Sequence, residues 1–315
     1  MISIVVPTYN GVDRLRRALE SIEAARERYD GETELVVVAD GCVDATEQAV
    51  AAEFPQARLI ALSPNVGFAG AVRAGVAATR GELLAILSDD LRLEPDFLGP
   101  LAAHFDDPNT FSVMPRILDP SGERLDIPPY YPTERLGQLK LKEVADPPAT
   151  SFPCFFTAGG IALFRRAMFE QLGGFSRLFA PGYHEDVDVC WRAWARGWTS
   201  RYEPAAVTYH HHQQGAFRTR YGALSLRAMK RRNWLLLNLI HLDRGVLSQL
   251  AWFLIRGLRR DLLRPARGLA VLAALPGILT RLPAALRQRR IERAERRHAN
   301  AEVFALIPAD PRGGA

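Results

Sequence analysis

The chain has 315 residues, 48% of them hydrophobic and 24% charged, so it can bury at least one large core and is not a disordered polymer. The three cysteines, Cys42, Cys154 and Cys190, are widely spaced and odd in number, so they indicate neither a disulfide framework nor a zinc cluster. The opening stretch, MISIVVPTYN, lacks the basic region and cleavage site of a signal peptide. We therefore expect a cytoplasmic protein.

The charges are unevenly distributed along the chain. The formal net charge is +5, but the stretch from Arg218 to Arg297 holds 19 Lys or Arg against 4 Asp or Glu. This stretch therefore carries +15, which leaves −10 for the remainder. The distribution predicts a basic C-terminal region attached to an acidic body.

Strand-like and helix-like segments alternate through the first ninety residues. Near-continuous apolar runs predict strands, and amphipathic segments between them predict helices, the first over Val12 to Ala25. The four apolar runs are ISIVVP, ELVVVAD, RLIAL and ELLAILSDD. Apolar strands separated by helices are typical of a parallel sheet covered on both faces. The sequence therefore predicts an α/β fold with a mostly parallel sheet.

Polar clusters stand at the end of each of these four runs: PTYN, DGCVD, SPNVG and SDD. Because ligands of such sheets bind beyond the carboxyl ends of the strands, we expect the four clusters to converge on one crevice. Asp89 and Asp90 follow a buried strand, and their oxygens suit Mg²⁺ or Mn²⁺ bound together with phosphates. Acids are also common in turns for purely structural reasons.

The middle of the chain contains an irregular stretch and then regular elements. The segment from Ser121 to Thr150 is rich in proline and charge, which predicts an excursion or mobile loop. After it, TAGGIALFRRAMFEQLGGF predicts a glycine turn, a short strand and a helix. Another helix begins within YHEDVDVCWRAWARGW, whose three acids fit either a reactive site or a favourable helix start.

The last hundred residues predict helices in which short apolar patches alternate with arginine-rich stretches. The longest uncharged run, about a dozen residues that include Pro276, is too short for the roughly 20 residues that span a bilayer. Basic flanks on short apolar helices favour a helix lying on an anionic membrane surface. A soluble helical subdomain with solvated arginines is the alternative. Nucleic-acid binding is not expected, because no nucleic-acid-binding fold accompanies the basic stretch.

Six stretches in this order resemble the family-2 glycosyltransferases of the GT-A fold, over roughly residues 2 to 240, and among them the rhamnosyltransferases. They are VVPTYN, VVADGCVDAT, NVGFAGAVRAG, LAILSDDLRLEPDFL, GGIALFRRAMFEQLGGF and YHEDVDVCWRAWARGW. The resemblance implies a Rossmann-like GT-A domain that binds a nucleotide sugar over residues 1–217. We expect residues 218–315 to form a basic, amphipathic helical region that associates with a membrane.

The resemblance also implies roles in donor binding. Asp40 would accept a hydrogen bond from a pyrimidine N3–H, and Pro7 and Tyr9 would pack around the base and ribose. Asp89 and Arg73 would complete the nucleotide-binding site, with Arg73 near the phosphates.

The resemblance also implies residues for metal binding and for catalysis. Asp90 would hold the Mg²⁺ or Mn²⁺ that bridges the two phosphates, with His210 as a further ligand. Asp186 would be the general base that takes the proton of the acceptor hydroxyl, while Glu185 orients the site. The acceptor side would be formed by two glycines, Gly159 and Gly160.

The implied activity is inverting, metal-dependent transfer of a sugar from a UDP or dTDP sugar to a hydroxyl of a glycan or polyprenyl-linked acceptor. Such a reaction suits cell-envelope polysaccharide synthesis by a protein peripheral on the inner face of the cell membrane. Ser88 replaces the residue usual at the first position of the metal motif, which motivates the alternative of a non-catalytic membrane-bound nucleotide-sugar-binding module. A nucleotidyltransferase is a third interpretation, although PTYNGVDRLRRA lacks the glycine-rich basic loop of those enzymes.

Overall fold

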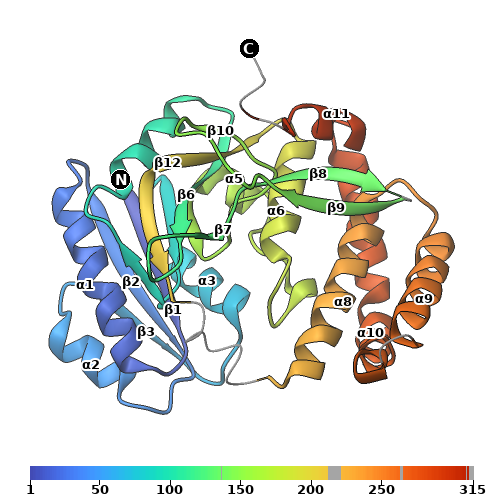
Figure 1. Ribbon diagram of the computed structural model, residues 1–315. Coiled ribbons are helices and arrows are strands. Elements are labelled where there is room, and N and C mark those ends of the chain that lie inside the picture. The colour runs from blue at the N-terminus through green and yellow to red at the C-terminus, as the bar shows by residue number, and fades with distance from the viewer. Residues whose placement is uncertain (136, 212–220, 263–264, 310, 312–315) are drawn as a thin grey trace.

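The structure is a computed structural model of the whole chain, and it describes all residues except 136, 212–220, 263–264, 310 and 312–315. Over 256–262 and 265–268 it describes the backbone alone. A large twisted sheet with helices on both faces forms the body, and the C-terminal helices stand side by side along one flank (Figure 1).

The central sheet has the strand order β10-β12-β6-β11-β4-β1-β2-β3. The strands from the N-terminal part of the chain are parallel to one another, and those from the later part are mixed. Strands β3, β2, β1 and β4 are parallel, β11 is antiparallel to β4 and β6, and β12 is parallel to β6. The predicted fold class is thus confirmed. The strands are β1 (Ile2–Thr8), β2 (Thr33–Asp40), β3 (Arg58–Leu62), β4 (Leu83–Leu87), β5 (Leu91–Leu93), β6 (Thr110–Leu118), β7 (Leu125–Ile127), β10 (Phe152–Pro153), β11 (Ile161–Arg165) and β12 (Thr199–His210).

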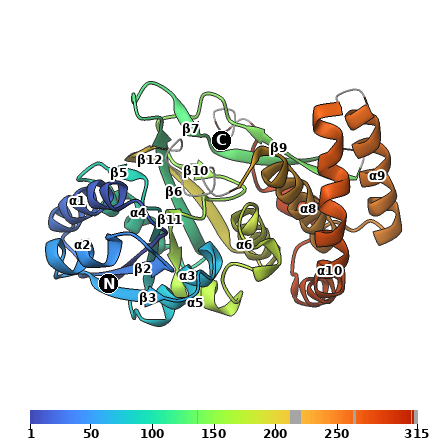
Figure 2. The same cartoon turned by 90° about the horizontal axis from the view of Figure 1, so that it is seen from below.

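Helices connect the strands and cover both faces of the sheet, as Figure 2 shows from below. Those of the sheet domain are α1 (Val12–Arg28), α2 (Thr46–Glu53), α3 (Phe68–Ala77), α4 (Leu98–Ala102), α5 (Arg166–Gln171) and α6 (Glu185–Ala195), with short 3₁₀ turns η1 (Ala103–Asp106) and η2 (Arg177–Phe179). The C-terminal helices are α8 (Ala223–His241), α9 (Val246–Leu262), α10 (Pro265–Glu295) and α11 (Asn300–Ala305).

Strand β1 explains how the two faces are buried. Successive side chains of a strand point to opposite faces, so Ile4 and Val6 pack in the cluster that contains Leu15 of α1, whereas Val5 packs with Ala71 of α3. Both faces are apolar because both are covered by helices. This packing fixes the carboxyl ends of β1, β2 and β4 at one edge of the sheet.

The segment from Ser121 to Thr150 corrects a prediction, because much of it is regular. It contains β7 and an antiparallel hairpin, β8 (Tyr130–Arg135) and β9 (Gln138–Glu143), whose turn includes Gly137 at φ +70°. Leu139 of the hairpin is fully buried, and its N–H donates to Asn238 Oδ1 of α8 (2.9 Å). Contacts with the C-terminal helices therefore order a stretch whose composition alone suggested a loop.

The C-terminal helices share a core with the rest of the chain. One buried cluster contains Trp191 and Trp194 of α6 together with Leu236, Leu237 and Ile240 of α8. Arg289 of α10 donates to backbone carbonyls at the end of α8, at Leu242 (2.7 Å) and also at Leu239. Helix α8 therefore packs against α6 and completes this part of the core.

Helix α10 is longer than the sequence pattern indicated. It continues through Pro276 and Pro283, and Leu269–Glu295 is long and apolar enough, by length and composition alone, to cross a membrane. The expectation that no apolar segment has that length was therefore wrong. Packing against α8 offsets the hydrogen bonds that the prolines remove. The buried residues of α10 that share clusters with α8 are Ala274, Ile278 and Ala285.

Candidate active site

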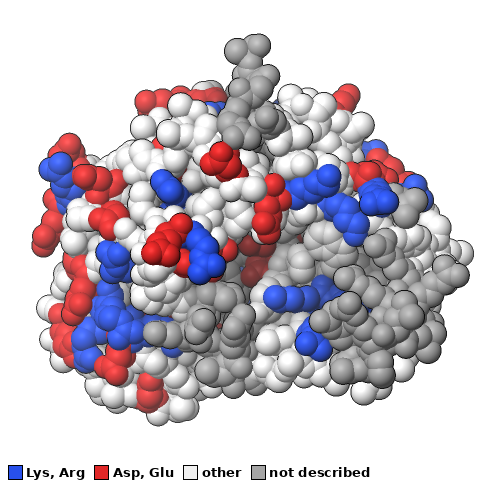
Figure 3. Space-filling model, viewed as in Figure 1, with Lys and Arg blue, Asp and Glu red and all other residues white. Residues whose placement is uncertain are grey.

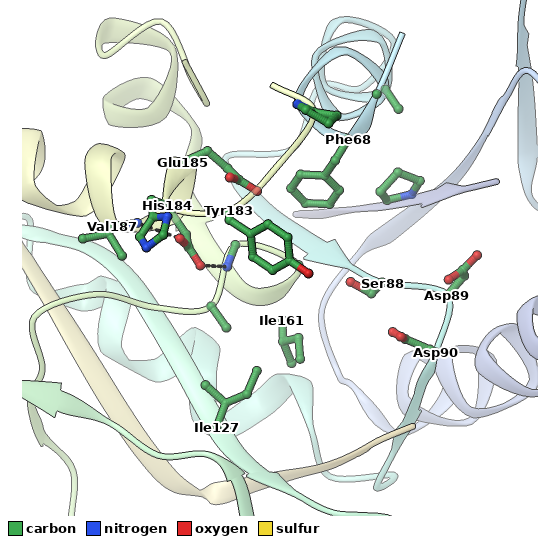
Figure 4. Close-up of a pocket in the computed structure, with 18 of the residues that line it drawn as sticks. Phe68, Ser88, Asp89, Asp90, Ile127, Ile161, Tyr183, His184, Glu185 and Val187 are labelled. Carbon is green, nitrogen blue, oxygen red and sulfur yellow. Dashed lines mark hydrogen bonds between the residues drawn. The ribbon is translucent and has the colours of Figure 1, made fainter. Parts of the chain in front are cut away.

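A cavity of about 630 Å³ opens at the carboxyl edge of the parallel strands. All four polar clusters that end the first strands contribute to it, as predicted. Acidic side chains are visible in the hollow at the middle of this face, and basic side chains gather on its rim (Figure 3). Ser88, Asp89 and Asp90 lie on one side of the pocket, and His184 and Glu185 lie on the other (Figure 4).

Asp40, at the end of β2, is nearly buried and holds the next loop in place. Its two oxygens accept hydrogen bonds from the N–H groups of Val66 (2.7 Å) and Gly67 (2.8 Å), and Asn65 Nδ2 donates to the Asp40 carbonyl (2.6 Å). Gly41 follows at φ +72°, where a Cβ would lie 2.7 Å from Asn65 N. Each Asp40 oxygen retains a lone pair, so the carboxylate can still accept from a ligand in the cavity.

Asp89 is bound to a residue that the sequence did not single out. Arg14 Nε and Nη2, from α1, donate to its two oxygens at 3.0 and 2.9 Å, and Thr8 Oγ1 donates at 2.6 Å. Burial raises the pKa of the Asp89 carboxyl, and Arg14 counteracts this effect. With both oxygens engaged, Asp89 neutralises Arg14 inside the wall of the cavity.

Asp90 lines the cavity, and one of its oxygens, Oδ1, is buried and has no hydrogen-bond partner among the described residues. Its Oδ2 lies 3.5 Å from His210 Nε2, and His210 Nδ1 lies 2.6 Å from Asp126 Oδ2. Burial opposes the charged form of Asp90, but His210 outweighs it and holds the pKa of this carboxyl below its usual range. Asp126, on β7, is a second site residue that the sequence did not reveal.

This arrangement fits a divalent cation bound together with phosphates. Among the described residues, no group of three or more His, Cys, Asp or Glu side chains could enclose a metal on its own. Asp90 Oδ1 and His210 Nε2 would supply two ligands, and Mg²⁺ or Mn²⁺ commonly takes the rest from substrate phosphates and water. The Asp126 carboxylate on His210 Nδ1 matches the outer-shell partner that orients metal-binding histidines.

Glu185 and Asp186 begin α6 on the opposite side of the cavity. Asp186 accepts hydrogen bonds from Gly159 N–H (3.3 Å) and Val187 N–H (2.8 Å), and burial raises its pKa. Burial, and then the charge of Asp186, raises the pKa of Glu185 to about 8, and its buried Oε2 has no partner within the described part of the chain. Burial therefore favours a proton on this pair at neutral pH.

The two glycines before β11 allow the chain to pass close both to Ser88 and to Asp186, which lie on opposite sides of the cavity. A Cβ on Gly160 would lie 2.2 Å from Ser88 Oγ, and one on Gly159 would lie 3.1 Å from Asp186 Cβ.

The predicted site residues all line the cavity except Arg73, which is exposed on α3 and is not among the lining residues. Arg73 points away because the buried face of α3 is its Ala71, Val72, Gly75 and Val76 side.

Much of the remaining lining of the cavity is apolar and was not predicted. Tyr130 stacks on Phe156 with ring centroids 5.3 Å apart. Lys230 of α8 is the single Lys or Arg among the described lining residues. The alternation in QLKLKE, residues 138–143, was a signal that could have revealed this hairpin wall. The other apolar residues of this part are Ile127, Leu141 and Val187.

We predict that Arg14→Leu lowers the free energy of unfolding by about 3 kcal/mol, because it leaves the Asp89 charge buried and unpaired. Adding Asp89→Asn should restore most of this loss. Arg17→Leu, at an exposed arginine of the same helix, should cost less than about 0.5 kcal/mol. Urea unfolding of the four proteins measures the differences, and equal losses for Arg14→Leu and Arg17→Leu would contradict the pairing.

We predict that Glu185→Gln stabilises the protein increasingly as pH rises from 4.5 to 8. The folded state binds the Glu185 proton more tightly than the unfolded state in this window, so wild-type stability falls as pH rises. Glutamine has no such proton. The difference should approach about 2 kcal/mol at pH 8, since water in the open cavity screens part of the burial. Urea unfolding of both proteins at several pH values tests this, and a pH-independent difference would refute the assignment.

Comparisons with known proteins agree with this architecture. The chain is 29% identical over 216 residues to the pre-mycofactocin glycosyltransferase of Mycobacterium tuberculosis strain CDC 1551 / Oshkosh, which covers 67% of this chain and 43% of that protein. It therefore spans less than half of that relative. It is 26% identical over 242 residues to the N-acetylglucosaminyl-diphospho-decaprenol L-rhamnosyltransferase of the same strain, covering 67% of this chain and 76% of that protein.

Among solved structures, the chain is similar to GalNAc-T7 crystallised with UDP, GalNAc and Mn²⁺. The TM-score is 0.59 at 15% identity, and the match covers 77% of this chain and 48% of that one. This likeness concerns the fold, which is the GT-A fold of glycosyltransferases. The model of the family described as glycosyl transferase family 2 matches residues 3–173, more than half of the chain. The chain therefore belongs to glycosyl transferase family 2.

Proposed function

We propose that this glycosyltransferase moves a sugar from a UDP or dTDP sugar to a hydroxyl of a lipid-linked glycan acceptor, with inversion at the anomeric carbon. The observation that carries the proposal is one cavity with two unlike halves. Asp40 and Asp90 line the half at the strand ends, and Glu185 and Asp186 line the other half. A donor and an acceptor bound in these halves would meet between them.

The half at the strand ends suits the donor. Pro7 and Tyr9 line the cavity beside Asp40, so a flat base could pack against them while its N–H donates to the carboxylate. A uracil or thymine offers such an N–H at N3. The crystal structure of GalNAc-T7 with UDP gives independent support for a uridine nucleotide on this fold.

Asp90 and His210 would hold the divalent cation. When bound, Mg²⁺ or Mn²⁺ would neutralise charge on the leaving diphosphate. Asp126 would keep His210 Nδ1 engaged (2.6 Å) and so direct Nε2 toward Asp90. Arg14 cancels the charge of Asp89, which leaves Asp90 as the acid of this pair that can face a ligand.

Asp186 would be the base. Its raised pKa gives it a greater affinity for the proton of the attacking hydroxyl than an ordinary carboxylate has. The N–H groups of Gly159 and Val187 fix its orientation, and a protonated Glu185 beside it removes like-charge repulsion. Attack from this side, with the leaving diphosphate on the other, would give inversion in one displacement.

The apolar remainder of the cavity suits an acceptor that carries a lipid and a phosphate. Tyr130, Leu141 and Phe156 offer an apolar wall, and Lys230 offers a positive charge at the mouth. The relative named N-acetylglucosaminyl-diphospho-decaprenol L-rhamnosyltransferase combines these features in its substrate. We therefore propose a polyprenyl-linked acceptor in cell-envelope polysaccharide synthesis.

We further propose that residues 218–315 bind the inner face of the cell membrane peripherally, without spanning it. Among the described residues, most exposed large hydrophobic side chains belong to α8, α9 and α10. Exposed Arg287, Arg290 and Arg293 of α10 would attract anionic lipids. Spanning would require α10 to give up its packing against α8. The exposed apolar residues are Leu224, Leu247, Ile255, Leu269, Leu272, Leu279 and Ile291.

Asp186→Asn should lower the rate of sugar transfer by about 10² to 10⁴, because the acceptor hydroxyl loses its base. Binding of UDP with Mn²⁺ should stay within about twofold of the wild type, since Asp186 lies across the cavity from the donor half. Transfer assays with UDP and dTDP sugars and isothermal titration measure the two effects. Transfer within tenfold of the wild type would reject Asp186 as the base, and a wild type that binds donors but never transfers would favour a binding module.

Leu272→Asp with Leu279→Asp should weaken binding to vesicles that contain phosphatidylglycerol by at least about tenfold, since two apolar anchors become charged. Leu306→Asp is the matched control, because Leu306 and Leu272 are both 52% exposed and Leu306 follows α11 instead. Vesicle sedimentation with and without the anionic lipid measures the affinities. Equal losses for the double variant and the control would reject α10 as the membrane-binding helix.

A further inference from the structure

The turn that leads into α6 has an unusual backbone. Tyr183 and His184 are consecutive, have φ angles of +73° and +74°, and directly precede Glu185 and Asp186. This left-handed region is unfavourable for residues with large side chains, because Cβ approaches the following carbonyl oxygen. His184 also occupies the N-cap position of α6 without a side-chain hydrogen bond to the helix. Something outside the turn must therefore hold it.

Asn233 of α8 makes the contacts that hold this turn. Its side chain is fully buried, and its Nδ2 lies 2.8 Å from the carbonyl oxygens of Phe179 and Gly182 and 2.9 Å from that of Tyr183. Its Oδ1 accepts from Arg232 Nε (2.9 Å). The three carbonyl oxygens need a donor and Arg232 needs an acceptor. Flipping the side-chain amide of Asn233 would therefore lose both sets of hydrogen bonds.

Residues on either side of Asn233 contact the same turn. Arg232 Nη2 donates to the Ala180 carbonyl (2.6 Å), Lys230 Nζ lies 4.2 Å from the centre of the Tyr183 ring, and Trp234 packs edge-on against His184 at 5.2 Å. Side chains from one turn of α8 therefore contact the segment that precedes Glu185 and Asp186. The close-up shows Tyr183, His184 and Glu185 together at the cavity (Figure 4).

We infer that Asn233 is a positioning residue for the reaction: it fixes the turn at 179–184 and thereby sets where Glu185 and Asp186 stand in the cavity. This inference rests on the proposed function. Asn233 itself does not line the cavity, so its effect on catalysis passes through the backbone. A displacement of about 1 Å at a catalytic group can cost about 10²-fold in rate.

Asn238→Ala provides a matched control for Asn233→Ala. Asn238 is also fully buried on α8, and its amide also bonds backbone groups, Leu139 N–H (2.9 Å) and the Trp234 carbonyl (2.7 Å). Its contacts are to β9 and to its own helix, so losing it should loosen the hairpin and not the turn. A general loss of packing would affect both variants alike.

Hydrogen exchange followed by mass spectrometry compares the three proteins. In Asn233→Ala, amides of residues 183–188 should exchange at least tenfold faster than in the wild type. In Asn238→Ala, this stretch should be unchanged and residues 138–141 should exchange faster. The inference is overturned if both variants accelerate both stretches equally, or if 183–188 is unaffected in Asn233→Ala. If that variant does not fold, Asn233→Ser, which keeps one donor, replaces it.

Kinetics then tests the catalytic part. Turnover of whichever UDP or dTDP sugar the wild type uses should fall about 10²-fold in Asn233→Ala, with KM for the donor within about threefold. Asn238→Ala should keep its rate of donor hydrolysis, which needs no acceptor, within about threefold, because the hairpin that it loosens lines the acceptor part of the cavity. Equal turnover in Asn233→Ala and the wild type would overturn the inference. A wild type without transfer or donor hydrolysis would instead overturn the proposed function. The hydrogen-exchange comparison would still test whether Asn233 fixes the turn at 179–184.

Discussion

The constraint on which this site depends is the gathering of carboxylates around one cavity: Asp40, Asp89 and Asp90 follow parallel strands, and Glu185 and Asp186 begin a helix opposite them. Parallel strands end together, so acids that follow them share one cavity, where burial and mutual repulsion oppose their charge. Their partners differ: an arginine pairs with Asp89, a histidine with Asp90, and two loop N–H groups with Asp40, while two N–H groups bind Asp186 and burial raises the pKa of both Glu185 and Asp186.

Because their partners differ, the acids that line the cavity have different roles. Asp89 is neutralised by Arg14 and supports the wall, whereas Asp90 lines the cavity and keeps a buried oxygen without a partner among the described residues. On the opposite side, α6 presents its acids only because α8 holds the preceding turn. Asp188, one turn further along α6, pairs with Arg192 and with His241 of α8 (2.8 Å). The C-terminal helices thus belong to the architecture of the site.

Much of the fold and of the site could be predicted from local pattern. Apolar runs and their polar ends gave the strands and the convergence of Asp40 and Asp90 on one crevice, because both follow from periodicity along a single segment. Arg14 and Asp126 could not be found this way, since their partners lie 75 and 84 residues away and pattern carries no information on such pairs. The hairpin at 130–143 was missed because Pro132, the prolines on either side of the hairpin and its charges outweighed its alternation.

The most direct test of a pyrimidine-diphosphate and metal site is thermal unfolding with UDP, dTDP or GDP, each with and without Mn²⁺. A ligand at 100 times its dissociation constant adds about 2.7 kcal/mol of stability. UDP or dTDP, but not GDP, should stabilise the wild type only when Mn²⁺ is present, and Asp90→Ala should abolish the effect. Stabilisation by GDP, or by UDP without Mn²⁺ and regardless of Asp90, would contradict the roles given to Asp40 and Asp90.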